Sequence, residues 1–244
     1  MAIARRLAAY AVRALIVAAA AVPALSGADA ALIHYYDFAT PGAVFDEVGT
    51  SNGLLLGGAT VSGNALHLDG SSAYVQFADQ LVPTGNATYS VLVRASGTPN
   101  PGTFTEIVSQ GASGTGFYIG TRPGGEMRAT DYFLSTGFTF PSGVHDYLFS
   151  SGPGGSRFYV DNFLVVNSPT QAAITSSGTA TRFGRQFDIY AEYFAGDVSS
   201  VRVFDSVEVP AAVPEPAAWS LLIAGFAAVG AALRRRAARV LGVN

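Results

Sequence analysis

The segment from residue 31 to residue 209 contains no stretch of ten or more residues with the apolar spacing of an amphipathic helix. Short runs of aromatic and β-branched residues recur there instead, between clusters of Gly, Ser, Asn and Pro. The runs that predict strands are His34–Phe38, Ala65–Leu68, Ala73–Phe77, Tyr89–Arg94, Glu106–Ser109, Gly116–Ile119, Asp146–Ser150, Arg157–Val160, Phe163–Val166, Thr181–Phe183 and Asp197–Phe204. So many short strands in about 180 residues predict an all-β chain folded as a large antiparallel sandwich.

Three turns can be predicted from their residue types. Asp161-Asn162 separates two of the predicted strands by two residues that both tolerate a positive φ, which predicts a tight hairpin. Ser151–Ser156 reads Ser-Gly-Pro-Gly-Gly-Ser and predicts a longer, flexible turn before that hairpin, with three consecutive antiparallel strands in all. Gly111–Gly116 has the glycines of a phosphate-binding loop but lacks Lys and a following helix, so we expect a flexible strand connection.

The first 30 residues have the pattern of a secretory signal peptide. Three arginines precede an uncharged apolar stretch, Ala14–Leu25, and the small residues Ala28 and Ala30 then occupy the specificity positions of an A-x-A cleavage site. The apolar stretch is too short to cross a hydrocarbon core about 30 Å thick at 1.5 Å per residue. We therefore expect residues 1–30 to be removed by signal peptidase after Ala30.

The C-terminal end has a second apolar segment. Residues 217–233 carry no charge, a length at the short limit for a transmembrane helix, and arginines directly after the run would hold that end in the cytoplasm. We expect a linker at 210–216, a membrane helix at 217–233 and a basic cytoplasmic tail at 234–244. The residues that mark this pattern are Pro214, Glu215, Pro216, Trp219, Arg234, Arg235 and Arg236.

The order Pro-Glu-Pro, Trp, apolar helix and arginine cluster resembles the PEP-CTERM sorting signal of Gram-negative bacteria. The resemblance implies an exosortase-type processing enzyme as partner and a cut near Pro214–Pro216. It also implies transient anchoring in the inner membrane, followed by transfer to the cell surface or extracellular matrix. The alternative is a permanent single-span anchor with a tri-arginine stop signal.

The segment between the two ends is acidic. Residues 31–213 contain seven arginines and fifteen carboxylates, so the formal charge is 7 − 15 = −8, compared with −3 for the whole chain. Such a surface stays soluble and repels anionic polymers unless divalent cations intervene. It lacks the dense basic face of a nucleic-acid-binding protein. The absence of cysteine excludes a disulfide scaffold, a cysteine-ligated zinc site and a thiol enzyme.

A series of short blocks along this segment resembles a laminin-G-like domain of the concanavalin A-like lectin/glucanase superfamily. The blocks are His34-Tyr35-Tyr36-Asp37-Phe38, Asn52-Gly53, Gly57-Gly58-Ala59, Gly63–Gly70, Ala73-Tyr74-Val75, Tyr89-Ser90-Val91, Phe158–Asn162 and Phe194–Phe204. The resemblance implies a jelly roll of two curved antiparallel sheets over residues 31–209, whose first and last strands lie close together. Asn162 replaces the usual hairpin glycine, and Ser199-Ser200 replaces an acidic pair that could have supported a metal.

Calcium is the one cofactor that the resemblance suggests, since such domains often bind it through oxygen ligands. Asp46 in the first long loop and Asp197 before the last strand are the candidate ligands, because we expect those segments to be neighbours. The alternative is that each is a turn or cap residue on a solvated rim.

The carboxylates do not have the pattern of a glycosidase. Retaining enzymes on this fold need two carboxylates about 5 to 5.5 Å apart, usually two or four residues apart on one strand face. Glu106 has no carboxylate two or four residues away. The pairs Glu126/Asp131 and Glu192/Asp197 are each five residues apart, so on a strand the two side chains of a pair would point to opposite faces. The sequence therefore predicts a protein that is not an enzyme.

Other candidate residues are weaker. The histidines His34, His67 and His145 have no metal-ligand spacing, so we expect half-buried strand residues. Sugar platforms need exposed aromatic faces. The aromatic residues that could serve are Tyr118, Tyr132, Phe133, Phe138, Tyr190 and Tyr193.

Taken together, the sequence favours an exported, non-enzymatic surface or matrix protein with one adhesion or carbohydrate-binding module, whose partner is an exopolysaccharide or other glycan. Two alternatives remain: a purely structural matrix component without a dedicated ligand, and a divergent polysaccharide hydrolase.

Overall fold

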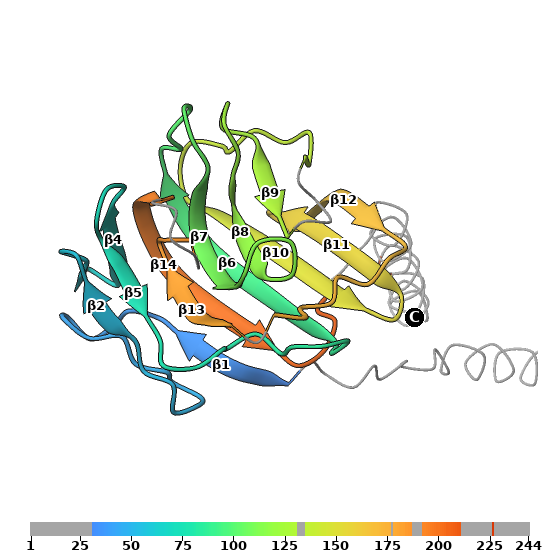
Figure 1. Ribbon diagram of the computed structural model, residues 1–244, viewed down its shortest axis with the longest axis horizontal. Coiled ribbons are helices and arrows are strands. Elements are labelled where there is room, and N and C mark those ends of the chain that lie inside the picture. Colours follow the sequence, from blue (N-terminus) through green and yellow to red (C-terminus); the bar gives the residue numbers. More distant parts are fainter. Residues whose placement is uncertain (1–30, 131–134, 177, 187–191, 211–225, 227–244) are drawn as a thin grey trace, which may run out of the picture. The chain divides into compact units, whose positions relative to one another are not determined.

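A computed structural model describes residues 31–130, 135–176, 178–186 and 192–210, together with Phe226. Over these ranges the chain forms two antiparallel sheets that pack face to face (Figure 1). The expected antiparallel sandwich is therefore confirmed. The expected signal peptide with Ala28 and Ala30 and the Pro-Glu-Pro motif lie outside the described residues. So does the expected helix at 217–233 with its arginines, apart from Phe226.

The larger sheet has the order β12-β11-β10-β6-β14-β4-β3, and β1 pairs with β14 beside this path. Its strands are β1 (Leu32–Tyr36), β3 (Thr60–Ser62), β4 (Ala65–Asp69), β6 (Tyr89–Gly97), β10 (His145–Gly152), β11 (Gly155–Val160), β12 (Phe163–Ser168) and β14 (Ala195–Phe204). The smaller sheet has the order β2-β5-β13-β7-β8-β9. Its strands are β2 (Leu54–Leu56), β5 (Tyr74–Gln76), β7 (Thr105–Gly111), β8 (Phe117–Thr121), β9 (Met127–Ala129) and β13 (Thr179–Phe183).

Each of the eleven predicted strands is present, with ends that differ by a few residues. The sequence missed β2, β3 and β9, which have three residues each. Three residues are too few to show the alternation of apolar and polar side chains by which a strand is recognised. The segment Leu54-Leu55-Leu56 has no alternation at all.

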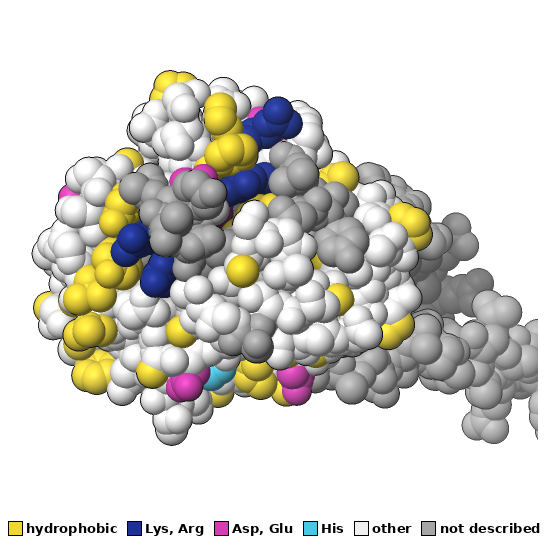
Figure 2. All heavy atoms as spheres, viewed as in Figure 1, with side chains coloured by type: hydrophobic (Ala, Val, Ile, Leu, Met, Phe, Trp, Pro, Cys, Tyr) yellow, Lys and Arg dark blue, Asp and Glu magenta, His cyan; other side chains and the backbone are white. Residues whose placement is uncertain are grey.

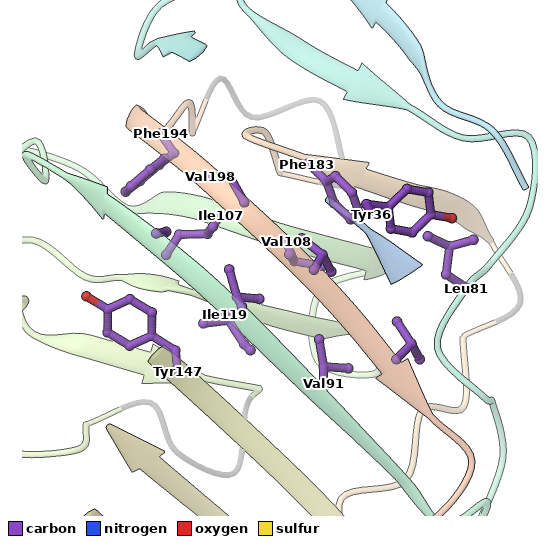
Figure 3. Close-up of a cluster of buried hydrophobic side chains, with 14 of the residues drawn as sticks. Tyr36, Leu81, Val91, Ile107, Val108, Ile119, Tyr147, Phe183, Phe194 and Val198 are labelled. Carbon is purple, nitrogen blue, oxygen red and sulfur yellow. The ribbon is translucent and has the colours of Figure 1, made fainter. Parts of the chain in front are cut away.

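The core lies between the two sheets and is rich in aromatic rings (Figure 3). Tyr36 of β1 packs edge-on against Phe183 of β13, with ring centroids 5.3 Å apart, so the contact joins the two sheets. The strand β6 shows the expected single buried face, because Val91 and Val93 are fully buried while Arg94 is exposed. Burial of alternate side chains from both sheets stabilises the sandwich.

The first and last strands of the domain are neighbours, as the family resemblance implied. Tyr36 of β1 opposes Val201 of β14, and His34 opposes Val203. Both ends of the folded segment therefore reach the same sheet.

The predicted hairpin at Asp161-Asn162 is confirmed, since both residues have a positive φ, 49° and 69°, and join β11 directly to β12. The predicted flexible turn at Ser151–Ser156 is wrong. The strands β10 and β11 stay paired to their ends at Gly152 and Gly155. The hydroxyls of Ser151 and Ser156 are buried and each accepts a hydrogen bond from the Ala172 amide at 2.9 Å, which holds these residues in the sheet.

No helix among the described residues is long and apolar enough to cross a membrane.

Candidate ligand-binding face

The outward face of the smaller sheet carries a row of polar and aromatic side chains that oppose one another directly. Gln76 of β5 opposes Arg182 of β13, Arg182 opposes Ser109 of β7, and Ser109 opposes Tyr118 of β8. Directly opposed residues project to the same side of a sheet. The next residue on β13, Phe183, projects to the other side, into the core. This row therefore crosses four strands on the side of the sheet that faces away from the core, where Gln76 and Arg182 are half-buried and Ser109 and Tyr118 are buried.

A second row on the same face is built around a glycine. Glu106 of β7 opposes Gly120 of β8, and Gly120 opposes Arg128 of β9. A β-carbon at position 120 would overlap the carbonyl oxygen of Thr105 and lie 2.5 Å from Oε2 of Glu106. The absence of a side chain at Gly120 lets the carboxyl group of Glu106 and the guanidinium of Arg128 meet above β8.

Arg128 is bound by two carboxylates and packs between two aromatic rings. Its Nη2 donates to Oε1 of Glu106 and to Oε2 of Glu192, the latter at 3.1 Å. Its guanidinium lies between the rings of Phe104 and Tyr118, 4.1 and 4.3 Å from their centroids. The Glu106 amide donates to the Glu192 carbonyl at 3.2 Å, which brings the second carboxylate alongside β7. The Arg128 side chain is only 7% exposed, so this cluster forms a rigid part of the face.

The two glutamates of this cluster cannot both be ionised without a net negative charge beside one guanidinium. Burial raises the pKa of Glu106 to about 8, although the charge of Arg128 acts in the opposite direction. Burial also raises the pKa of Glu192, against the effect of Arg128. The pair therefore retains one proton around neutral pH, and titrates as a unit.

At the other end of the face, a guanidinium rests on aromatic rings. Arg185 lies 4.9 Å from the ring centroid of Tyr74 and 5.3 Å from that of Tyr193. Its Nε is buried and has no hydrogen-bond partner among the described residues, and no carboxylate in that part of the chain forms an ion pair with it. Beside it, Arg182 Nε donates to Oε1 of Gln76 at 2.6 Å. Basic and apolar side chains gather on this face (Figure 2).

The aromatic residues predicted as sugar platforms differ in exposure and location. Tyr193 is half-buried on this face, whereas Tyr118 is only 2% exposed and serves as a base for Arg128. Phe138 packs against the core. The other three candidates, Tyr132, Phe133 and Tyr190, lie outside the described residues.

The sequence did not single out Tyr74, Arg128, Arg182, Arg185 or Gly120. Their relationship depends on strand register, which no local pattern reveals.

The sequence shows no two carboxylates with the spacing of a glycosidase pair on one strand. In the folded chain, however, two carboxylates from different segments lie close together. Glu106 and Glu192 belong to segments far apart in the sequence and meet at Arg128. Glu106 has no exposed surface, so its carboxyl group has no contact with solvent or with a ligand on the face.

All three histidines are half-buried strand residues, as expected. Each Nδ1 lies beside an aspartate oxygen, and the pairs are His34 with Asp46 at 2.6 Å, His67 with Asp197 at 2.7 Å and His145 with Asp161 at 2.6 Å.

The two predicted calcium ligands lie in different places. Asp46 accepts hydrogen bonds from the backbone amides of Tyr35, Gly49 and Ser51 and from His34. Burial acts to raise its pKa, but these hydrogen bonds outweigh that effect and lower it. Asp46 is thus the cap residue of its loop.

Asp197 lies far from that loop. His34, beside Asp46, opposes Val203 on β14, six residues from Asp197, or roughly 20 Å at ~3.3 Å per residue. The expectation that the two aspartates are neighbours is therefore wrong. Among the described residues no group of three His, Cys, Asp or Glu side chains could hold a metal ion.

A family model described as the concanavalin A-like lectin/glucanases superfamily matches residues 69–213, more than half of the chain. The chain belongs to the concanavalin A-like lectin/glucanase superfamily. A model of the PEP-CTERM protein-sorting motif matches residues 212–236 of this concanavalin A-like protein. That motif indicates export and membrane-associated sorting in Gram-negative bacteria.

Solved structures with the same fold come from several kinds of protein. Domain 4 of an extracellular arabinanase from Geobacillus stearothermophilus, in complex with arabinotriose, aligns with a TM-score of 0.58 at 18% identity, over 74% of this chain and 95% of that domain. Trypanosoma rangeli sialidase aligns at 0.54 and 12% identity, over 72% of this chain and 31% of the sialidase. The receptor-binding domain of a botulinum neurotoxin C/D mosaic serotype aligns at 0.51 and 14% identity, over 72% and 48%. These likenesses show the fold of the concanavalin A-like domain alone. A search of curated protein sequences finds no match.

Proposed function

We propose that this protein is an exported, non-enzymatic glycan-binding module of the cell surface or extracellular matrix, and that it binds the glycan on the outward face of the smaller sheet. The observation that carries the proposal is the group formed by Tyr74, Tyr193 and Arg185, beside the hydrogen-bonding side chains of Gln76 and Arg182.

This group combines the two kinds of contact that a sugar needs. A pyranose ring has apolar C–H faces that stack on aromatic rings, and hydroxyl groups that bind amide and guanidinium groups. Tyr74 and Tyr193 are both half-buried, and their ring centroids lie 6.3 Å apart with the ring planes at 57°, so the two rings are neighbours that present differently oriented surfaces to a ligand. Gln76 and Arg182 extend it along the register row described above.

The carboxylate pair supports a binding role rather than glycoside hydrolysis. A glycosidase places its two carboxyl groups on either side of the scissile bond, where both contact the substrate. Glu106 has no exposed surface, and Glu106 and Glu192 both contact the same Nη2 atom of Arg128. The pair therefore serves to fix Arg128.

The two ends of the chain would direct export of the protein and its sorting to the cell surface or matrix. The PEP-CTERM motif at 212–236 supports processing by an exosortase-type enzyme, with the membrane anchor as a transient stage. Signal peptidase would remove residues 1–30.

The test is polysaccharide binding by the full chain, purified in a mild detergent and applied to an array of neutral and acidic glycans. Tyr74→Ala and Tyr193→Ala each remove one ring, and we expect affinity losses of about fivefold to tenfold, or about 1 to 1.4 kcal/mol. Tyr35→Ala is the matched control, because Tyr35 stacks on Arg202, at 4.8 Å, in the other sheet.

Failure of the wild-type protein to bind any glycan on the array would refute the proposal and leave a purely structural role. Release of reducing sugar from a bound polysaccharide would instead show an enzyme.

A further inference from the structure

We infer that the ligand of this face is an anionic glycan, and that Arg185 binds its carboxylate groups. The inference rests on the proposed function and adds the chemical class of the ligand.

More than half of the arginines in the segment 31–213 lie in or beside the smaller sheet. The segment 31–213 has a formal charge of −8, yet four of its seven arginines belong to the smaller sheet and its adjoining turns. They are Arg122, Arg128, Arg182 and Arg185. The charge of the whole segment would repel a polyanion, so an anionic ligand can bind only where the local field is reversed.

Two of these arginines are already neutralised by carboxylates of the protein. Arg122 pairs with Glu126 at 3.6 Å, and Arg128 pairs with both Glu106 and Glu192. These guanidinium groups have their counter-ions within the protein. Arg185 differs, because no carboxylate of the described residues pairs with it.

Arg185 is held by two tyrosine rings and by a hydrogen bond to its backbone. Its guanidinium rests on the rings of Tyr74 and Tyr193, and its Nε is buried without a hydrogen-bond partner in the described part of the chain. Ser109 Oγ donates to the Arg185 carbonyl at 2.6 Å and fixes the backbone at its base. A guanidinium positioned in this way loses little conformational freedom when it binds a carboxylate through two parallel hydrogen bonds.

A hexuronate polymer fits both features of the group. Its rings can stack on the tyrosines, and each carboxylate can supply an ionic partner that the described residues do not give Arg185. A neutral polymer of the same sugars could stack in the same way but would bring no carboxylate to Arg185. Charge-assisted hydrogen bonds are about twice as strong as neutral ones, so we expect at least a tenfold preference for the anionic polymer.

The experiment compares polygalacturonate with its fully methyl-esterified form, which has the same sugar rings without the charge. Binding to the full chain in detergent is measured in low salt and with EDTA, so that no divalent cation can bridge acidic groups. We expect the wild-type protein to bind polygalacturonate at least tenfold more tightly than the ester. Higher salt should weaken polygalacturonate binding and leave binding to the ester unchanged.

Arg185→Gln should abolish this preference, while Arg185→Lys should retain part of it. Arg202→Gln is the matched control, since Arg202 also stacks on a tyrosine, Tyr35, but in the other sheet. It should keep the full preference. The melting temperature of each variant shows that it is folded.

Equal binding of both polymers by the wild-type protein would overturn the inference while the proposed function stands. Loss of the preference in Arg202→Gln but not in Arg185→Gln would also overturn it. Binding of heparin without binding of polygalacturonate would assign the site to sulfate instead of carboxylate. If the protein binds neither galacturonate polymer but binds other neutral glycans on the array, the inference is overturned and the proposed function stands. If it binds no glycan on the array, both the inference and the proposed function are overturned.

Discussion

Asp46→Ala should remove a set of hydrogen bonds that hold the first long loop against β1. The Asp46 carboxylate accepts from His34 Nδ1 at 2.6 Å and from the amides of Gly49, Tyr35 and Ser51 at 2.9, 3.1 and 3.2 Å. Its side chain has no exposed surface. Alanine would leave these four donors without their acceptor.

The expected cost follows from the burial of those donors. A donor left unpaired away from water costs about 1 to 3 kcal/mol, and less where water can reach it. The three residues that donate their amides are each half-buried. We therefore expect the free energy of unfolding to fall by about 3 to 5 kcal/mol. For a domain of this size, that loss lowers the melting temperature by roughly 10 °C.

The assay is thermal and urea unfolding of the wild-type protein and the variant, at neutral and at acid pH. Because the fold lowers the pKa of Asp46, its contribution is present above the usual pKa of Asp and is lost as the pH falls through the lowered value. The difference between wild type and variant should therefore shrink in acid.

Asp197→Ala is the matched control. The Asp197 and His67 side chains are 50% and 40% exposed, so this pair should contribute at most about 1 kcal/mol. A loss below about 1 kcal/mol for Asp46→Ala would refute the reasoning about the loop. So would a melting temperature that rises with calcium in the wild type and loses this response in both variants.

Three further changes test other parts of the structure. Gly120→Ala should cost about 1 to 3 kcal/mol in urea unfolding, because its β-carbon would overlap the Thr105 carbonyl; an unchanged midpoint would contradict this. Because the folded pKa of Glu106 is raised to about 8, wild-type stability should fall as the pH rises from about 5 to 8, and Glu106→Gln should flatten that slope in thermal scans; equal slopes would show that Glu106 is ionised. Asn162→Ala should cost about 1 kcal/mol, because alanine tolerates a φ of 69° less well than asparagine; equal stability in chemical unfolding would count against a strained turn.

Local patterns were sufficient to predict most strands and the tight hairpin at Asp161-Asn162, because alternation and turn residues act over a few positions. They failed at Ser151–Ser156, where the glycine-rich composition of a linker occurs in paired strand ends. The buried serine hydroxyls that hold these ends are bound by the distant residue Ala172.

The site was less predictable than the strands. Glu106 and Arg128 meet because β7, β8 and β9 form a meander with Gly120 between them, and Glu192 joins them only when the chain returns beside β7. The expectation that Asp46 and Asp197 are neighbours was wrong for a related reason. Two segments that approach the same strand, β14, can still lie at different points along it, as Asp46 and Asp197 do.

The most direct test of the account is amide hydrogen exchange on the full chain with and without polygalacturonate, since it locates the bound face without mutation. We predict slower exchange in β5 and β13, where Tyr74, Gln76 and Arg182 lie, and around Arg185 and Tyr193. A hollow of about 260 Å³ on the other sheet, lined by Leu92, Leu148 and Arg202 among others, is a competing location among the described residues. Protection confined to the strands around that hollow, with none in β5 and β13, would contradict the assignment of the binding face.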